Sequence, residues 1–434
     1  MSPPRKIALV DANSFYCSAE KVFRPDLAKV PVVVLSNNDG CVIARDAMSK
    51  ALGIPMGQPW FQLKADIKRY RWPVVAFSSN YTLYGDLSAR FMSVLGQFVA
   101  PEDLEQYSID ECFLDFSRYR IDGAETGREI RQRVLQWTGL PVCVGIGATK
   151  TLAKLANNVA KKRQEWSGVC DLSVLPDLEL DSLLAGFDVG DVWGIGRRLA
   201  DSLRRGGIRT AADLRQADPR QIRQRFNVVV EKTVSELQGI SCLPWDEVPP
   251  AKKQIIASRS FGAPLFTVSE LSEPIHLHAC RAAEKLRQQG SVAGRVGEWI
   301  RTNHFREQDD QYSPSHSVQL PEPTADSAAI ASWAMRILRG IHRGGYRYVK
   351  AGVMLDDIGP ADSVQRSLFN ATPPQQRAGR DRLMQLMDRA NSRWGRGTIG
   401  VGAAGVREER PWTMQRDMIS PPYSTRWEHV RTCS

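Results

Sequence analysis

The sequence predicts a multidomain α+β protein, and three observations support this fold class. The chain has 434 residues, which is enough for roughly two to four domains with separate hydrophobic cores. Up to about residue 165, short apolar segments of strand length alternate with segments of helical periodicity. From 180 to 240 the pattern is helical throughout, and from 252 to 357 strand patterns return beside a basic helix.

The first 165 residues carry local signals for strands, turns and helices. The β-branched run at 31–35 predicts a strand, and the Asn-Asn-Asp-Gly sequence after it predicts a turn. Good helix formers at 44–52 stop at Gly53, and apolar residues at 79–98 recur at helical spacing. The aromatic and apolar segment 107–116 suits a β-hairpin. The other expected elements are a strand, a turn and a helix start over 5–25, strands at 41–43 and 141–146, and helices at 124–137 and 149–163.

The rest of the chain is punctuated by glycine and proline. Glycines interrupt the helical region 180–240, and Pro244, Pro249 and Pro250 mark a linker. Beyond the linker we expect strands at 255–261 and 349–355 and a basic helix around 279–289. The tail from 358 is rich in Gly, Pro, Ser and Arg, which predicts loose order over part of its length.

The composition favours a polyanionic partner and a reducing compartment. Lys and Arg number 58 against 48 Asp and Glu, a formal charge of +10, so nucleic acid is the leading candidate. The eight cysteines contain no CxxC pair, which speaks against a zinc site or a disulfide framework. The longest aliphatic stretch, at 30–35, is too short to span a bilayer, and the N-terminus has no signal-peptide core. We therefore expect a cytoplasmic protein that is not a membrane protein.

Three carboxylates are the first candidates for chemistry. Asp11 ends the apolar run at 7–10, and Asp110 and Glu111 lie within the segment 107–115. Strands that deliver carboxylates at their ends make a pocket of hard oxygen ligands, which Mg²⁺ prefers. Two such ions would clamp both oxygens of a phosphoryl transfer, so the pattern predicts a metal-dependent nucleotidyl transferase. An alternative stays open, in which Asp110 and Glu111 form a solvated hairpin tip and Asp11 is a helix N-cap.

A row of lysines is the second candidate. Lys150, Lys154 and Lys161 fall within an arc of about 40° on the helix predicted at 149–163, at 100° per residue. Close to a carboxylate site, such a row would suit a triphosphate. The alternative is a solvated basic face. The chain has no GxxxxGK[ST] sequence, so a P-loop is not its phosphate-binding device.

The third candidate is a Gly-x-Gly sequence between two short helices, at Gly194 and Gly196. Such a turn exposes backbone N–H groups at a helix N-terminus, where they bind phosphate without reading base sequence. With Ala200, Leu203 and Gly207 downstream, the spacing predicts a helix-hairpin-helix rather than an isolated turn.

Two smaller motifs complete the set. Tyr16 lies five residues after Asp11, where a bulky ring beside a nucleotide sugar would exclude a 2′-hydroxyl; a plain core aromatic is the alternative. The segment 365–369 places Leu368 and Phe369 in a polar tail, which indicates a docking peptide; a local hydrophobic staple is the alternative.

These motifs, in this order, resemble the Y-family translesion DNA polymerases, and among them the UmuC type, the catalytic subunits of bacterial DNA polymerase V and their plasmid-borne relatives. The resemblance covers essentially the whole chain, and several motifs in the correct order are far more specific than any one. They lie at 11–16, 35–45, 107–111, 149–157 and 191–198, with three tail elements at 394–398, 412–414 and 420–426.

The resemblance implies a right-hand polymerase fold with a palm, small fingers, a helical thumb that carries the helix-hairpin-helix, an α/β little finger and a C-terminal tail. The tail would hold a clamp-binding peptide and a partner-binding region. The expected boundaries are 1–25 and 80–168 for the palm, 26–79 for the fingers, 169–245 for the thumb, 252–357 for the little finger and 358–434 for the tail.

The resemblance also implies roles for individual residues. Asp11, Asp110 and Glu111 would be catalytic and would hold two Mg²⁺ ions, with the Ala12 carbonyl as a further ligand. Tyr16 would be the steric gate. Two positions, Ala47 and Arg366, depart from the family pattern, which has a triphosphate-binding tyrosine and an aliphatic residue there. The implied contacts are Phe15, Arg45, Lys50 and Lys161 for the nucleotide; Gly194, Gly196 and Arg197 for DNA; and Gln365, Leu368 and Phe369 for a sliding clamp.

The function implied is error-prone translesion DNA synthesis in the SOS response to DNA damage, by template-directed addition of dNTPs. The implied partners are primer–template DNA, dNTP, a UmuD′-like homodimer, RecA and the sliding clamp. One alternative is a non-catalytic DNA-binding scaffold of polymerase ancestry at stalled forks, which the intact carboxylates disfavour. The other is a helix-hairpin-helix repair nuclease, which Tyr16 and the fingers-like segment disfavour.

Overall fold

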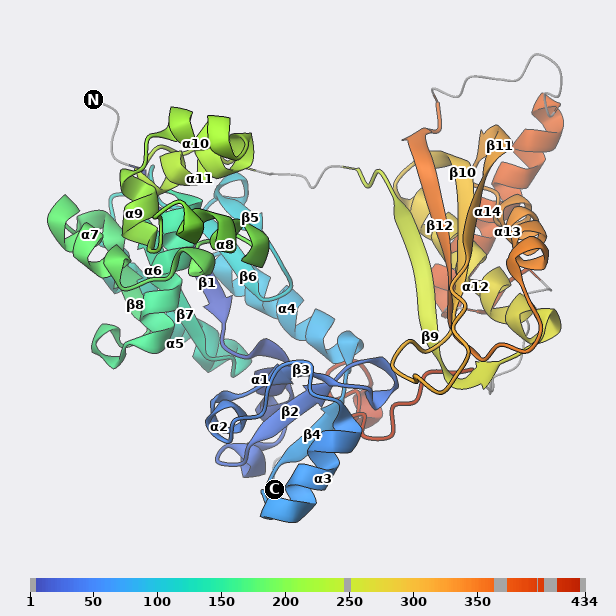
Figure 1. Cartoon of the computed structure of the whole chain (residues 1–434), viewed down its shortest axis with the longest axis horizontal. Helices are drawn as coiled ribbons and strands as arrows, with labels where there is room; N and C mark the ends of the chain where they lie inside the picture. The colour runs from blue at the N-terminus through green and yellow to red at the C-terminus, as the bar shows by residue number, and fades with distance from the viewer. Residues whose placement is uncertain (1–4, 246–250, 363–372, 396, 402–411, 430–434) are drawn as a thin grey trace. The chain divides into compact units, whose positions relative to one another are not determined.

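The computed structural model describes residues 5–245, 251–362, 373–395, 397–401 and 412–429 (Figure 1). The chain divides into two compact units. Unit 1 is Met1–Pro249 together with Met418–Ser434, and unit 2 is Pro250–Asp417. The chain therefore leaves unit 1 inside the predicted proline linker and returns to it near its C-terminus.

A five-stranded sheet in the order β5-β6-β1-β7-β8 forms the centre of unit 1. The middle strand β1 is antiparallel to both neighbours, β6 and β7, and β8 is parallel to β7. The strands are β1 Ile7–Ala12, β5 Leu104–Gln106, β6 Glu111–Asp115, β7 Val142–Gly147 and β8 Val169–Asp171.

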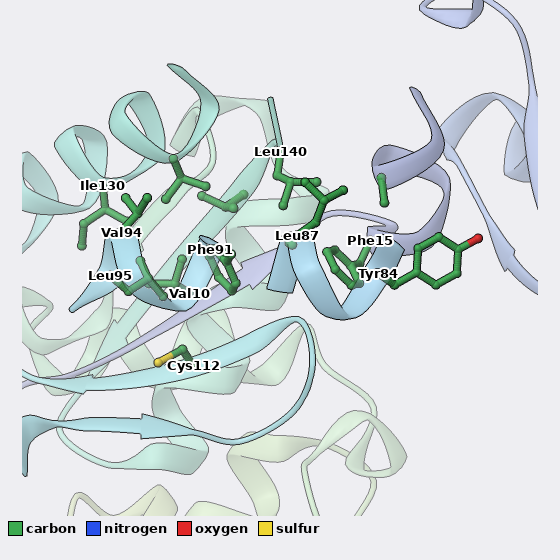
Figure 2. Close-up of a cluster of buried hydrophobic side chains, with 14 of the residues drawn as sticks. Val10, Phe15, Tyr84, Leu87, Phe91, Val94, Leu95, Cys112, Ile130 and Leu140 are labelled. Atoms are coloured by element: carbon green, nitrogen blue, oxygen red, sulfur yellow. The ribbon is translucent and has the colours of Figure 1, made fainter. Parts of the chain in front are cut away.

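Alternation along β1 buries both faces of this sheet. Ala8 and Val10 point into a core shared with α4 (Tyr81–Leu95) and α5 (Gly123–Thr138), part of which is drawn in Figure 2. Ile7 and Leu9 point to the other face, where they meet Ala153 of α6 (Lys150–Lys162). A Cβ at Gly145 of β7 would lie 2.0 Å from the Asn157 backbone nitrogen, so only glycine permits this close approach of helix and strand.

A separate three-stranded sheet in the order β3-β2-β4 follows β1 and the helix α1 (Phe15–Val22). Its central strand β2 is antiparallel to β3 and parallel to β4. The elements are β2 Val32–Leu35, β3 Val42–Arg45, α2 Ala47–Ala51, α3 Trp60–Tyr70 and β4 Val75–Ser78.

Five helices follow β8, as the glycine-punctuated pattern predicts. They enclose their own apolar core, which includes Leu184, Leu203 and Leu214 and continues onto α6 through Leu155 and Val159. The helices are α7 Asp177–Ala185, α8 Arg197–Arg205, α9 Ala211–Gln216, α10 Pro219–Arg225 and α11 Val228–Leu237. Short 3-10 turns in unit 1 lie at Pro25–Leu27, Asn37–Asp39, Pro101–Asp103, Gln164–Trp166, Leu172–Val174, Val189–Asp191 and Trp427–His429.

Unit 2 is an antiparallel sheet in the order β11-β10-β12-β9, with two helices packed on one face. Its elements are β9 Ile255–Leu265, α12 Val268–Gln288, β10 Ser291–Arg301, β11 Ser315–Thr324, α13 Ser327–Ile341 and β12 Tyr348–Pro360. A third helix, α14, spans Pro374–Trp394 and is tied to α12 by an ion pair of 2.7 Å between Arg287 and Asp388. No helix in the described ranges is long and apolar enough to cross a membrane.

Most predicted elements are confirmed, and the differences have local physical causes. The helix expected at 44–52 is shorter, because Ala44 and Arg45 pair with β2 and Asp46 caps α2 by accepting from the Ser49 N–H. The hairpin expected at 107–116 is displaced, since its first strand is 104–106 and residues 107–110 are the turn. The sequence pattern missed α3, β4, β8, β10, β11, α13 and α14, the last of which lies in the predicted tail.

Candidate active site

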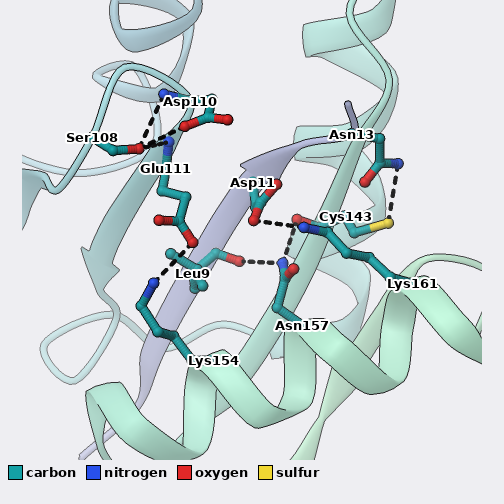
Figure 3. Close-up of polar contacts among 10 residues, drawn as sticks. All are labelled: Leu9, Asp11, Asn13, Ser108, Asp110, Glu111, Cys143, Lys154, Asn157 and Lys161. Carbon is teal, nitrogen blue, oxygen red and sulfur yellow. Dashed lines mark hydrogen bonds and ion pairs between the residues drawn. The ribbon is translucent and has the colours of Figure 1, made fainter. Parts of the chain in front are cut away.

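The three predicted carboxylates meet where β1 and β6 pair. Asp11 lies directly opposite Glu111 in the antiparallel register, and Asp110 is the last residue of the turn before β6 (Figure 3). The Ser108 hydroxyl organises that turn by accepting from the N–H groups of Asp110 and Glu111 and donating to Asp110 Oδ1 at 2.7 Å. The Ala12 N–H donates to the Asp110 carbonyl at 2.9 Å, which ties the turn to the end of β1. Asp110 and Glu111 are partly exposed, as the alternative of a solvated hairpin tip predicts. That alternative does not explain the hydrogen bonds that hold the turn in place.

Two lysines of α6 hold two of these carboxylates. Lys161 Nζ lies 2.6 Å from Asp11 Oδ2, and Lys154 Nζ lies 2.8 Å from Glu111 Oε1. Lys154 also lies over the Tyr107 ring, 4.3 Å from its centroid. The predicted lysine row therefore reaches the carboxylates at these two positions.

Lys150 does not belong to the same surface, which corrects the prediction of one row for a triphosphate. Its side chain is buried, and its Nζ lies 2.5 Å from Glu105 Oε2 and donates to the Pro244 carbonyl. The helical arc is as predicted, but Lys150 contacts Pro244 and lies 5.0 Å from the centroid of the Trp245 ring. Helical periodicity alone does not indicate which other parts of the chain pack over a face of the helix.

The site concentrates negative charge in a partly dry environment. Burial raises the pKa of Asp11 to about 6; Lys161 acts in the opposite direction, and the neighbouring charges of Glu111 and Asp110 raise it further. In the described part of the chain, no three His, Cys, Asp or Glu side chains are already gathered as a ligand set. The oxygens instead face lysine ammonium groups, so the donor chemistry fits a hard cation that would displace those amines.

A cleft of about 380 Å³ opens beside the carboxylates. Asp11, Glu111, Lys154 and Lys161 line it, together with Asn157, Asn158, Asp191 and Trp193, which were not predicted as site residues. Asn157 Nδ2 donates to the carbonyls of Leu9 and Cys143, at 3.3 and 2.9 Å, and so fixes α6 against β1 and β7. Asn157, Asp191 and Trp193 lie inside the sequence motifs at 149–157 and 191–198, and Asn158 directly follows the first. Their position in these motifs could have identified them as site residues.

Tyr16 lies on the first turn of α1, just after the end of β1. Its ring stacks on Tyr84 of α4, with centroids 4.5 Å apart and planes 16° apart, and meets the edge of Tyr81 at 6.0 Å. Burial raises the pKa of the Tyr16 hydroxyl, and Tyr81 and the charge of Asp110 add to the shift. The neighbouring Phe15 is buried in the core. Tyr16 is only partly buried but packs against the same core, so its position agrees with both the steric-gate prediction and the core-aromatic alternative.

Arg45 of β3 and Lys50 of α2, two of the predicted nucleotide contacts, are not among the residues that line the cleft beside the carboxylates. Arg45 Nη1 donates to the Ile54 carbonyl, and its buried Nε has no hydrogen-bond partner within the described ranges. Lys50 is exposed in the last turn of α2, and Ala47 is exposed at the start of that helix.

The predicted helix-hairpin-helix turn has the geometry that its glycines suggest. Gly194 has φ +88°, and Gly196 is the N-cap of α8, so the exposed Arg197 is the first residue of that helix. Trp193, just before the turn, packs edge-on against Tyr107 at 5.4 Å and so places the turn beside the carboxylate hairpin. The clamp-peptide residues Gln365, Leu368 and Phe369, with Arg366, lie outside the described residues.

Comparison with solved structures defines the fold of the protein. A Y-family DNA polymerase chimera of Dbh and Dpo4 superimposes with a TM-score of 0.63 at 20% identity, covering 82% of this chain and 99% of the chimera. DinB from Sulfolobus solfataricus gives a TM-score of 0.50 at 19% identity, covering 81% and 98%. The fold is that of a Y-family DNA polymerase, with palm, fingers, thumb and little finger.

Sequence comparison defines the family. Models of the impB/mucB/samB family and of its C-terminal domain match 10–158 and 252–368, and a model described as a domain of unknown function matches 381–432. Protein UmuC of Salmonella typhimurium LT2 is 46% identical over 98% of this chain and 99% of its own length. Protein SamB of Salmonella typhimurium is 44% identical over 98% of both chains. The chain belongs to the impB/mucB/samB family, the UmuC type of Y-family polymerase, and is an error-prone translesion DNA polymerase.

Proposed function

We propose that Asp11, Asp110 and Glu111 hold two Mg²⁺ ions, with the Ala12 carbonyl as a further ligand, and that dNTP addition takes place at this site. The observation that carries the proposal is the register of β1 and β6, which sets Asp11 against Glu111 with Asp110 adjoining. Y-family polymerases use divalent metal ions. When bound, the ions supply positive charge for the transition state and orient the attacking and leaving oxygens.

Other side chains of the site would bind and position the nucleotide. Lys161 is the more exposed of the two lysines that line the cleft, and we infer that it exchanges Asp11 for the triphosphate when a dNTP binds. Tyr16, whose ring is fixed by stacking on Tyr84, would occupy the space of a 2′-hydroxyl and exclude ribonucleotides. Phe15, Arg45 and Lys50 remain proposed nucleotide contacts, of which Phe15 is buried beside Tyr16.

The DNA contacts would come from backbone and basic groups. The N-terminus of α8, at Gly194, Gly196 and Arg197, presents free N–H groups suited to a phosphate.

We assign 1–25 and 80–168 to the palm, 26–79 to the fingers, 169–245 to the thumb, 252–357 to the little finger and 358–434 to the tail. A UmuD′-like homodimer, RecA and a sliding clamp at 365–369 are the proposed protein partners, and the cytoplasmic location remains a prediction.

Primer extension on undamaged and abasic templates, with and without those partners, tests the proposal. We expect Mg²⁺-dependent extension past the lesion, and no extension after chelation or with Asp110→Ala. A complex that extends no primer with all partners present would refute the proposed catalysis. A complex whose Asp110→Ala form extends at the wild-type rate would refute the metal-site assignment alone.

A further inference from the structure

The C-terminal segment 418–423, which belongs to unit 1, packs against the N-terminal part of that unit through backbone hydrogen bonds and buried side chains. The Met418 carbonyl accepts from the Ser78 N–H, and the Met418 N–H donates to Ser78 Oγ, both at 3.0 Å. Ile419 forms a parallel bridge with Ser78. Tyr423 is buried and stacks on Phe23, which ends α1, with centroids 4.9 Å apart. The segment therefore joins the end of β4 to the end of the helix that carries Tyr16.

Ser420 lies at the centre of this segment and orients the N-cap of α4. Asn80 Nδ2 donates to the Ser420 carbonyl at 3.2 Å and to Ser420 Oγ at 3.0 Å. These bonds fix the orientation of the Asn80 amide. Its oxygen then accepts a hydrogen bond from the Leu83 N–H at 3.3 Å. Residue 420 thus fixes the first turn of the helix that carries Tyr81 and Tyr84.

The same segment borders a buried carboxyl group that holds Tyr84. Glu20 and Tyr84 are both fully buried, and the Tyr84 hydroxyl donates to Glu20 Oε1 at 2.7 Å. Burial raises the pKa of Glu20 to about 7, and the hydroxyls of Tyr84 and Ser420 act against that shift. Glu20 follows Tyr16 by four residues on α1, so both side chains lie on the side of the helix that faces Tyr84.

We infer that the segment 418–423 is a positioning element for sugar discrimination. Ser420 holds the Asn80 amide, and the Asn80 carbonyl accepts from the Tyr84 N–H at 3.0 Å. Glu20 accepts from the Tyr84 hydroxyl, and Tyr84 holds the Tyr16 ring by stacking at 4.5 Å. The inference rests on the proposed role of Tyr16 as the steric gate. It gives a role to residues within the domain model at 381–432, and that role acts through Tyr16 and not by contact with the nucleotide.

The test measures the ratio of kcat/KM for dNTP over rNTP with the full-length chain in its extending complex. Ser420→Ala removes the hydroxyl, and Tyr84→Phe keeps the stacked ring but removes its hydrogen bond to Glu20. We expect each to lower the ratio roughly 3- to 10-fold, the range for a weakened aromatic stack, with a smaller change in kcat for dNTP. Thr425→Ala, at an exposed position just after the segment, is the matched control and should leave the ratio unchanged.

Double variants separate this inference from the gate assignment. In a Tyr16→Ala background, Ser420→Ala and Tyr84→Phe should have no further effect on the ratio, because their route runs through Tyr16. If Tyr16→Ala lowers the ratio and neither Ser420→Ala nor Tyr84→Phe does, the positioning role is wrong and the gate stands. If their effects persist without the Tyr16 ring, the route is wrong. If Tyr16→Ala itself leaves the ratio unchanged, the gate assignment fails and the inference falls with it.

Discussion

The two ends of helix α6 carry similar lysine–carboxylate pairs but differ in burial. Lys150 and Glu105 are 7% and 8% exposed, whereas Lys161 and Asp11 are 34% and 14% exposed, and the pair of Lys154 and Glu111 lies between them. A buried pair cannot exchange its partner without leaving a bare charge in the protein interior. A pair at the edge of a cleft can exchange a lysine for a ligand. We therefore infer that depth of burial separates a structural end of the helix, at Lys150, from a functional end, at Lys161.

Glu111→Gln should give the largest effect, because it removes one of the three carboxylates at the functional end. We expect primer extension to slow by roughly 10³-fold, the scale for losing one group that stabilises transition-state charge. The free energy of unfolding should change little, since Glu111 is partly exposed and Lys154 keeps its contact with Tyr107. Single-turnover extension and denaturant unfolding measure the two quantities, and a variant that retains a tenth of the wild-type rate would contradict the assignment.

Glu105→Gln is the matched change at the structural end and should affect stability instead. It leaves the buried Lys150 ammonium without its carboxylate, which costs about 3 kcal/mol in the free energy of unfolding. Extension per folded molecule should stay at the wild-type level. Urea unfolding with an extension assay on the folded fraction checks both. Equal losses of activity in Glu105→Gln and Glu111→Gln would remove the distinction between the two ends.

Asp11→Asn should stabilise the protein even though it removes a carboxylate from the site. Burial raises the pKa of Asp11 from 3.8 to about 6, so the folded state binds this proton more tightly than the unfolded chain. The contribution of Asp11 to stability is therefore complete below about pH 4 and is lost as the pH rises through 6. Asn has no charge to desolvate, so the variant should gain about 3 kcal/mol over wild type by pH 8. Unfolding curves at pH 4 to 8 measure this, and parallel curves for the two proteins would be inconsistent with it.

The sequence was sufficient to predict the carboxylates beside the cleft and insufficient to predict the buried pair at the other end of α6. Asp11, Asp110 and Glu111 were found because carboxylates that end apolar strands are a local pattern, and the two-strand register then brings them together. The burial of Lys150 was not predictable, because it depends on Pro244 and Trp245, about 95 residues away in the chain. The same holds for the contact of Ser420 with Asn80, which are separated by 340 residues. Periodicity reports which residues share a face and does not report what covers that face.

The elements missed in unit 2 have a related cause. Most side chains of β11 are exposed or half-exposed, because it is an edge strand, so its alternation is weak in the sequence. α14 buries only a narrow stripe, Met384, Met387 and Ala390, within an otherwise charged segment. Its contact with α12 through Asp388 is tertiary, and such contacts are invisible to a window of neighbouring residues.

Lys154→Met addresses the intermediate pair, where the expected effect is smallest. Methionine keeps an apolar stem beside Tyr107 and Trp193 but removes the ammonium that holds Glu111. If Lys154 competes with metal for this carboxylate, the Mg²⁺ concentration for half-maximal extension should fall about two- to five-fold, the range for a partly exposed ion pair. Lys162→Met, at an exposed position on the same helix, is the control and should leave the Mg²⁺ requirement unchanged. A higher requirement in Lys154→Met would mean that Lys154 orients Glu111 for the metal, which would place this pair with Lys150 and Glu105 as a structural contact.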